Sequence, residues 1–377
     1  MLRPKLALLL ALFAIAALPV ALAHAQKAEP PPRNMAVIWD NLSLSDSITY
    51  TLTGMPKLGP DKALEGWLIS DDNSVRLSTG IMTVAEDGSV NHSTTTPSGE
   101  NLIRRYDKVV ITVEPVPDPS PAKPSDEVLW SHRIPSRAME HIRHLLTNWP
   151  EPATKGVITN LKEQLEAALL HAQLAQAATT IAEFQTHAHH VINIIEGPTG
   201  SNFDADFGNP GDGIGVLTHA ADRKHAGFAA DMAPDDADIT NHAALVETNG
   251  KNVEDWAKQA RDQSLVALGV SGLTQAQIQM IPVIGLLNSA VNGTDAGGSG
   301  TIDSISGEGG AKQAYVEAQL MATYALSPGG LPKPIQLGPG LPSAGDSAVP
   351  MVAWLALAFG VALAAGGAAL FWRHHRA

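Results

Sequence analysis

The spacing of apolar residues changes at Pro135, and this change constrains the fold more than any other feature. Before Pro135, apolar and polar residues alternate, as in Ile48 to Leu52. A period of two is typical of strands with one buried face. After Pro135, apolar residues recur every three or four positions, as in 157–177, which indicates amphipathic helices. We therefore predict a multidomain β + α chain, with an all-β sandwich at 34–135 and an α-helical bundle at 136–326.

Several short segments of the first region have the composition of strands and are separated by turn residues. The predicted strands are 48–53, 64–69, 75–84, 109–113 and 128–130. Short strands at intervals of about 10 to 20 residues favour a sandwich of about 100 residues. The helical region contains a Gly-rich segment at 293–310, which we predict to be a flexible insert.

The order of motifs in the sandwich region resembles that of a known family. Gly66-Trp67-Leu68-Ile69 is followed by Ser78-Thr79-Gly80, an Asp87-Gly88 turn and Ile111-Thr112-Val113-Glu114-Pro115. This order is similar to that of the extracytoplasmic C-terminal domain of anti-sigma-K factors. The resemblance implies the fold and a sensing or scaffolding role, and it brings no catalytic residue. We interpret Trp67 as a buried sheet residue and Glu114 as a residue at a strand end.

The first 25 residues have the features of a secretory signal peptide. Arg3 and Lys5 precede the apolar run 6–23, and Ala23-His24-Ala25 supplies the small residues that a signal peptidase reads. An uncleaved N-terminal anchor is the alternative. Because a signal peptide stands where anti-sigma-K factors carry a sigma-binding segment, we expect no sequestration of a sigma factor.

The C-terminal end predicts a membrane anchor. Residues 349–372 carry no charge and are long enough to span about 30 Å of hydrocarbon. A Gly/Pro-rich stalk at 327–348 precedes this segment, and the basic tail 373–377 is expected to stay cytoplasmic. We therefore expect a single C-terminal transmembrane helix, with the bulk of the chain secreted across the cytoplasmic membrane.

Part of the stalk also resembles a sortase cell-wall sorting signal. The segment Leu341-Pro342-Ser343-Ala344-Gly345 precedes the apolar run and the basic tail. The usual motif has Thr where this chain has Ala344. Cell-wall attachment is therefore an alternative to the simple membrane anchor.

Composition limits the functions open to this chain. The absence of Cys excludes disulfides, thiolate zinc sites, cysteine nucleophiles and c-type haem attachment. The net charge of −13 argues against nucleic-acid binding. No nucleophile elbow, Walker loop or dinucleotide fingerprint stands in a fitting context. We therefore expect a non-enzymatic protein of the cell envelope that senses, binds or scaffolds, with an envelope protein as a partner.

Histidines gather in the helical region, and helix geometry predicts which of them lie together. If 157–177 and 180–196 form an antiparallel hairpin, His171 lies level with His187, and His190 lies one turn further along the same edge. A third helix that returns antiparallel would bring two more histidines to about the same height. The predicted ligands are His171, His187, His190, His219 and His225.

Imidazole nitrogens bind several first-row metals and haem iron. This set therefore predicts a site for Zn, Cu or Ni, or for a b-type haem. Partly exposed histidines without a ligand and a pH-responsive surface are the two alternative interpretations.

The loop that follows the hairpin supports a weaker prediction of a calcium site. Aligned with an EF-hand loop, Asp204, Asp206 and Asp212 occupy positions 1, 3 and 9. Asn209 and Gly215 stand where the motif needs Gly and a bidentate Glu. A turn without a ligand is the alternative interpretation.

Overall fold

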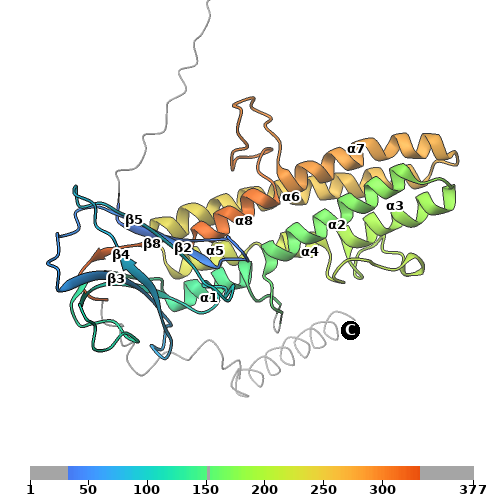
Figure 1. The fold of residues 1–377 in the computed structure, drawn as a ribbon. Coiled ribbons are helices and arrows are strands. Elements are labelled where there is room, and N and C mark those ends of the chain that lie inside the picture. The colour runs from blue at the N-terminus through green and yellow to red at the C-terminus, as the bar shows by residue number, and fades with distance from the viewer. Residues whose placement is uncertain (1–32, 151–152, 332–377) are drawn as a thin grey trace, which may run out of the picture. The chain divides into compact units, whose positions relative to one another are not determined.

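The computed structural model describes residues 33–150 and 153–331, shown as coloured ribbon in Figure 1. The described residues up to Gly330 belong to one compact unit. Within that unit two antiparallel sheets come first in the chain, helices follow, and the chain then returns to the sheets.

The strands form two sheets in which every pair of neighbours is antiparallel. The first sheet has the order β5 (Val90–Thr95), β2 (Ser47–Leu52), β1 (Met35–Trp39) and β8 (Tyr324–Ala325). The second has the order β4 (Arg76–Met82), β3 (Lys62–Ile69), β6 (Lys108–Pro115), β7 (Val128–Arg133) and β9 (Ser327–Pro328).

The alternation of residue types in β2 explains which of its faces is buried. Ile48, Tyr50 and Leu52 are at most 1% exposed, whereas Thr51 is exposed. The five strands expected from the sequence coincide with β2, β3, β4, β6 and β7. The strands β1 and β5 were not expected. β5 contains a single large apolar residue and pairs with β2 partly through hydroxyl groups.

The two residues interpreted as structural are both buried in the second sheet. Trp67 is 1% exposed and donates its Nε1–H to the Thr112 hydroxyl at 3.1 Å. Glu114 is 2% exposed and accepts hydrogen bonds from that hydroxyl and from the Ser125 backbone N–H. Both side chains therefore stabilise the sheet.

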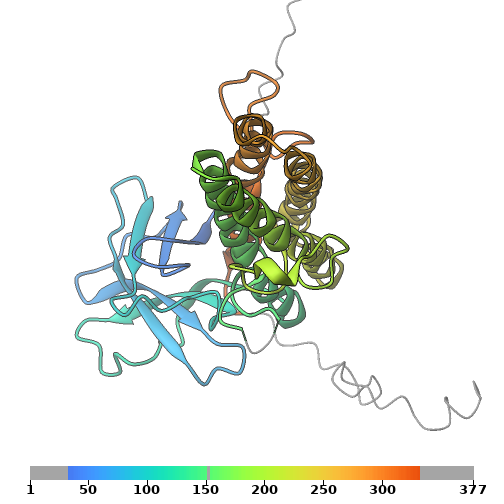
Figure 2. The ribbon, with the colours of Figure 1, turned by 90° about the vertical axis from the view of Figure 1, so that its right-hand side faces the viewer.

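The helical region contains a hairpin that packs against further helices (Figures 1 and 2). α2 packs against α3 and α7, α6 packs against α7 and α8, and α1 packs against α5. The described helices are α1 (Ser136–Leu146), α2 (Val157–Ala177), α3 (Ile181–Glu196), the 3-10 turn η1 (Ala205–Phe207), α4 (Val216–Asp222), α5 (His225–Met232), α6 (Ala237–Leu268), α7 (Leu273–Asn292) and α8 (Ala311–Leu320).

The end of the described chain completes both sheets. β8 pairs with β1, and β9 pairs with β7. Tyr324 is fully buried and donates its hydroxyl to the carbonyl of Tyr106 at 3.1 Å. Ser327 and Pro328, which we expected at the start of the stalk, form β9 instead. The helices are therefore inserted between β7 and β8, and one continuous apolar core joins them to the sheets.

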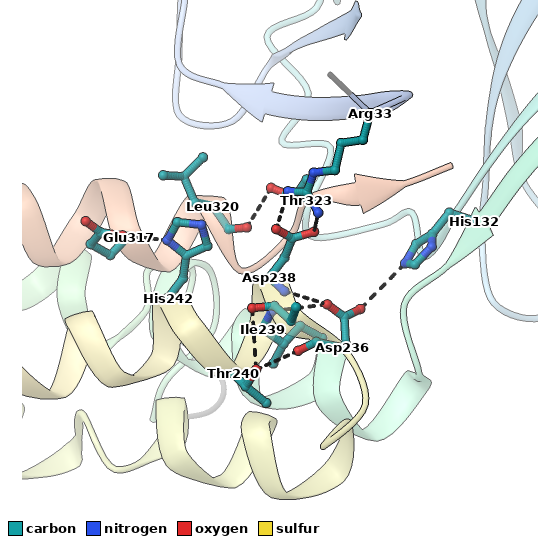
Figure 3. Close-up of polar contacts among 11 residues, drawn as sticks. Arg33, His132, Asp236, Asp238, Ile239, Thr240, His242, Glu317, Leu320 and Thr323 are labelled. Atoms are coloured by element: carbon teal, nitrogen blue, oxygen red, sulfur yellow. Dashed lines mark hydrogen bonds and ion pairs between the residues drawn. The ribbon is translucent and has the colours of Figure 1, made fainter. Parts of the chain in front are cut away.

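Polar contacts also tie the sheets to the start of α6 (Figure 3). Arg33, just before β1, forms a two-pronged ion pair with Asp238 in the first turn of α6. Asp236 caps this helix by accepting hydrogen bonds from two backbone N–H groups. His132 of β7 places Nε2 3.7 Å from the carboxylate of Asp236. The sheets and the longest helix therefore share a charged junction.

The Gly-rich segment 293–310 is fastened to α6 rather than free. Asn252 donates hydrogen bonds to the carbonyls of Ile305 and Gly309. Glu308 is 3% exposed and accepts a hydrogen bond from the Gly297 backbone N–H at 2.6 Å. Side-chain amides and a buried carboxylate thus hold a segment whose composition alone suggested a flexible insert.

The expected fold class and localisation need correction, because both included a transmembrane helix. Within residues 33–150 and 153–331, no helix is long and apolar enough to cross a membrane. The longest described helix, α6, carries polar and charged residues along one face, since it packs in a bundle with a solvated side. The fold that the structure supports is therefore β sheets followed by helices. The expected signal peptide, stalk residues beyond 331, sorting motif, span and basic tail all lie outside the described residues.

Candidate metal centre

Three histidines from two adjacent helices bring ring nitrogens together. His171 lies on α2, and His187 and His190 lie on α3. The Nδ1 atom of His171 is 3.0 Å from Nδ1 of His187 and 3.3 Å from Nδ1 of His190. These three residues, here called the α2–α3 cluster, offer ligand atoms that all lie within 4.8 Å of one another.

The local sequence explains why these helices form a hairpin. Thr180 caps α3 by accepting a hydrogen bond from the Glu183 backbone N–H at 3.2 Å. The Glu183 carboxylate accepts a hydrogen bond from the Thr179 backbone N–H at 2.8 Å. Because residues three apart share a helix face, His187 and His190 both lie toward His171.

The spacing of the nitrogens is close to that around a metal ion. Metal–imidazole bonds of about 2.0–2.1 Å in a tetrahedral arrangement separate the nitrogens by about 3.3–3.4 Å. The two measured separations, 3.0 and 3.3 Å, approach this value. A neutral imidazole nitrogen carries either one proton or one lone pair. Hydrogen bonding among three such atoms leaves one poorly paired, whereas a metal ion accepts all three lone pairs.

A backbone contact determines which nitrogen of His190 carries its proton. Nε2 of His190 lies 2.8 Å from the carbonyl oxygen of Phe207. Because a carbonyl only accepts, Nε2 is the donor, and in the neutral ring Nδ1 keeps its lone pair toward His171. Asn193 holds this loop by donating to the carbonyls of Asp204 and Gly208 at 2.7 and 2.6 Å. Such contacts orient ligands around protein-bound metals.

The protonation states also suit a ligand role. Burial, followed by the neighbouring His190 and His187, lowers the pKa of His171 to about 4. Burial and His190 likewise lower the pKa of His187. A metal ion binding near pH 7 would therefore not have to displace a proton from either ring.

Haem fits this arrangement less well than a single ion. Two histidines that bind haem iron stand on opposite sides of the porphyrin, with nitrogens about 4 Å apart. In the α2–α3 cluster, both separations from Nδ1 of His171 are shorter than that. The geometry therefore favours a metal ion over haem.

The other two predicted histidine ligands lie elsewhere. His219 is 1% exposed and places Nε2 2.6 Å from the carboxylate of Asp212. His225 contacts His141 and His144 of α1. The third helix that was expected to return antiparallel is interrupted at Arg223 and Lys224, so His219 and His225 lie on different helices, α4 and α5.

The structure does not bring the three predicted calcium ligands together. Asp204 accepts a hydrogen bond from the backbone N–H of Asp206 and caps the 3-10 turn. Asp212 accepts from the Ile214 backbone N–H and pairs with His219. In the part of the chain that the structure describes, the groups able to hold a metal ion include none of these aspartates. The carboxylates of Asp204 and Asp212 serve the turns that the sequence also indicated.

Sequence reasoning missed a second group of histidines. His141, His144 and His225, here called the α1–α5 cluster, also offer ligand atoms within 4.8 Å of one another. The available signal was the three-residue spacing of His141 and His144, which places both on one face of α1. Their partner lies more than 80 residues further along the chain.

Comparison with known proteins finds a match to the first third of the chain. The family model described as anti-sigma-K factor rskA, C-terminal, matches residues 6–128. The resemblance expected from the motifs is therefore confirmed, and this part of the chain is anti-sigma-factor-like. The match ends at the first residue of β7 and covers none of the described helices. Neither curated proteins nor solved structures gave a match to the chain.

Proposed function

We propose that this protein is a non-enzymatic, anti-sigma-factor-like binding protein whose α2–α3 cluster holds a transition-metal ion. The match at residues 6–128 supports a regulatory rather than an enzymatic role. The observation that carries the metal proposal is the convergence of three Nδ1 atoms from two helices. The ordered contact of His190 with the loop supports it further.

The ligand set indicates which ions bind. Three neutral imidazoles suit Zn, Cu and Ni, and affinity at such sites generally rises toward Cu²⁺. A bound ion would join α2 to α3 and leave a coordination position for water or another ligand. Because such an ion binds the folded chain alone, it raises the free energy of unfolding by about 2.7 kcal/mol at a concentration of 100 Kd.

The test is a titration of the untagged chain with Zn²⁺ and Ni²⁺, followed by metal analysis after gel filtration. We expect the double variant His187→Ala/His190→Ala to lose one bound ion and the associated rise in melting temperature. His92→Ala removes an imidazole from β5, outside both clusters, and should bind as the unmodified chain does. Equal binding by the double variant and the unmodified chain would refute the proposal.

A further inference from the structure

The α1–α5 cluster brings three more imidazoles to one point. Nδ1 of His225 lies 3.1 Å from Nδ1 of His141 and 3.4 Å from Nδ1 of His144. These separations also approach the value of about 3.3–3.4 Å expected for nitrogens on one tetrahedral ion. His141 and His144 lie on one face of α1, and α5 packs against this helix and begins at His225.

This cluster is more enclosed than the α2–α3 cluster. His225 is 5% exposed and His144 is 9% exposed. Nδ1 of His225 contacts the Nδ1 atoms of the other two histidines, and its Nε2 is buried without a hydrogen-bond partner. Burying imidazoles against one another is costly unless they share a ligand.

Aromatic rings cover the cluster. The Trp149 ring lies 4.7 Å from the His144 ring and 4.5 Å from the His225 ring, measured between centroids. The Trp149 Nε1–H donates to the carboxylate of Asp222 at 3.1 Å, which fixes the indole and places a negative charge beside the histidines. Such a negative charge would partly balance a bound cation.

We propose that His141, His144 and His225 form a second transition-metal site, enclosed by Trp149, that takes a first-row divalent ion with a preference for imidazole. This site shares no ligand with the α2–α3 cluster, so metal binding at one site can be tested independently of metal binding at the other. Removing one of its three ligands should weaken binding by more than about tenfold, since even the loss of a supporting contact costs that much.

The test uses Cu²⁺ with the untagged full chain, because an open-shell ion a few ångströms from an indole quenches its fluorescence. We expect two bound ions per chain and quenching that disappears in Trp149→Phe while both ions remain bound. His141→Gln/His225→Gln should lose one ion and the Trp149 quenching. His187→Ala/His190→Ala should lose one ion and keep the quenching. Circular dichroism establishes that each variant is folded, and if the His225 change prevents folding, His141→Gln alone carries the test.

The stoichiometries separate the two proposals. One ion that is lost with His187 and His190, without quenching of Trp149, would overturn the second site and leave the first. One ion that survives that variant but is lost with His141 and His225 would support the second site and overturn the first. Unchanged Cu²⁺ binding and quenching in a folded His141 variant would overturn the second site.

Discussion

The lowered pKa values of two histidines predict that the protein loses stability in mildly acidic solution. Burial is the main cause that lowers the pKa of His171 and of His225 to about 4, from an ordinary value of 6.5, and neighbouring imidazoles add to it. Between pH 6.5 and 4 the unfolded chain therefore holds protons on both rings that the folded chain lacks. Unfolding then takes up protons, so the stability present above pH 6.5 declines as the pH falls through this range.

The size of the effect follows from the two pKa values. A ring that titrates at 6.5 when unfolded and near 4 when folded lowers the free energy of unfolding by about 1.8 kcal/mol between pH 7 and pH 5. Because both clusters keep some contact with solvent, which screens their charges, we halve the change in the free energy of unfolding to about 1 kcal/mol for each ring. The two rings together then contribute about 2 kcal/mol.

Urea unfolding followed by circular dichroism at pH 7 and pH 5, with a chelator present, measures this difference. The matched control is the double variant His171→Gln/His225→Gln, in which the carboxylates titrate as before. The unmodified chain should lose about 2 kcal/mol more than the variant on acidification. An equal loss of unfolding free energy in the unmodified chain and the variant would refute the conclusion that His171 and His225 are buried and neutral.

Three further substitutions test the fold and the support of the metal centre. Phe184→Ala removes a fully buried ring of α3 and should cost about 3–5 kcal/mol in urea unfolding, whereas Phe228→Ala, at a position 40% exposed, should cost clearly less. Asp236→Ala removes the side-chain cap of α6 and should lower stability by about 1 kcal/mol in thermal melting, with Asp236→Asn close to unmodified. Asn193→Ala releases the loop that orients His190 and should weaken metal binding at the α2–α3 cluster by about 10–100-fold in calorimetric titration.

The α2–α3 cluster could be predicted because its geometry is local. His171 and His187 stand eight residues on either side of Thr179, and the rise per residue of a helix is constant. A hairpin therefore brings them level whatever the rest of the chain does. The same counting failed for His219, because its position depends on the course of the loop between α3 and α4.

Close approach of two glycines determines the course of that loop. Gly197 and Gly215 have positive φ angles of 68° and 105°. A Cβ atom on Gly197 would lie 2.1 Å from the carbonyl oxygen of Ile214. The two ends of the loop are therefore in close contact. The residue types predict turns at both ends, but they do not predict that the ends meet. The α1–α5 cluster was missed for a related reason, since its members meet through packing of helices far apart in sequence.

The short strands β8 and β9 could not be predicted either. Two residues are too few to show a period, and Met35 pairs with Ala325 across almost the whole described chain. Their formation depends on the buried Tyr324 and on the open edges that β1 and β7 present. The transmembrane prediction came from hydropathy at 349–372, which lies outside the described residues, and none of the described helices repeats that pattern.

The return of the chain to the sandwich determines how the protein bears a mechanical load. Met35 pairs with Ala325, and the Leu326 backbone N–H donates to the carbonyl of Asn34 at 2.9 Å. Both ends of the described chain therefore leave the first sheet from the same end of the β1–β8 ladder. A force that pulls them apart loads this ladder together with the β7–β9 pair and the Arg33–Asp238 ion pair. The histidine clusters lie in the part of the chain that these contacts close, so the contacts at its two ends take up the load before the clusters do.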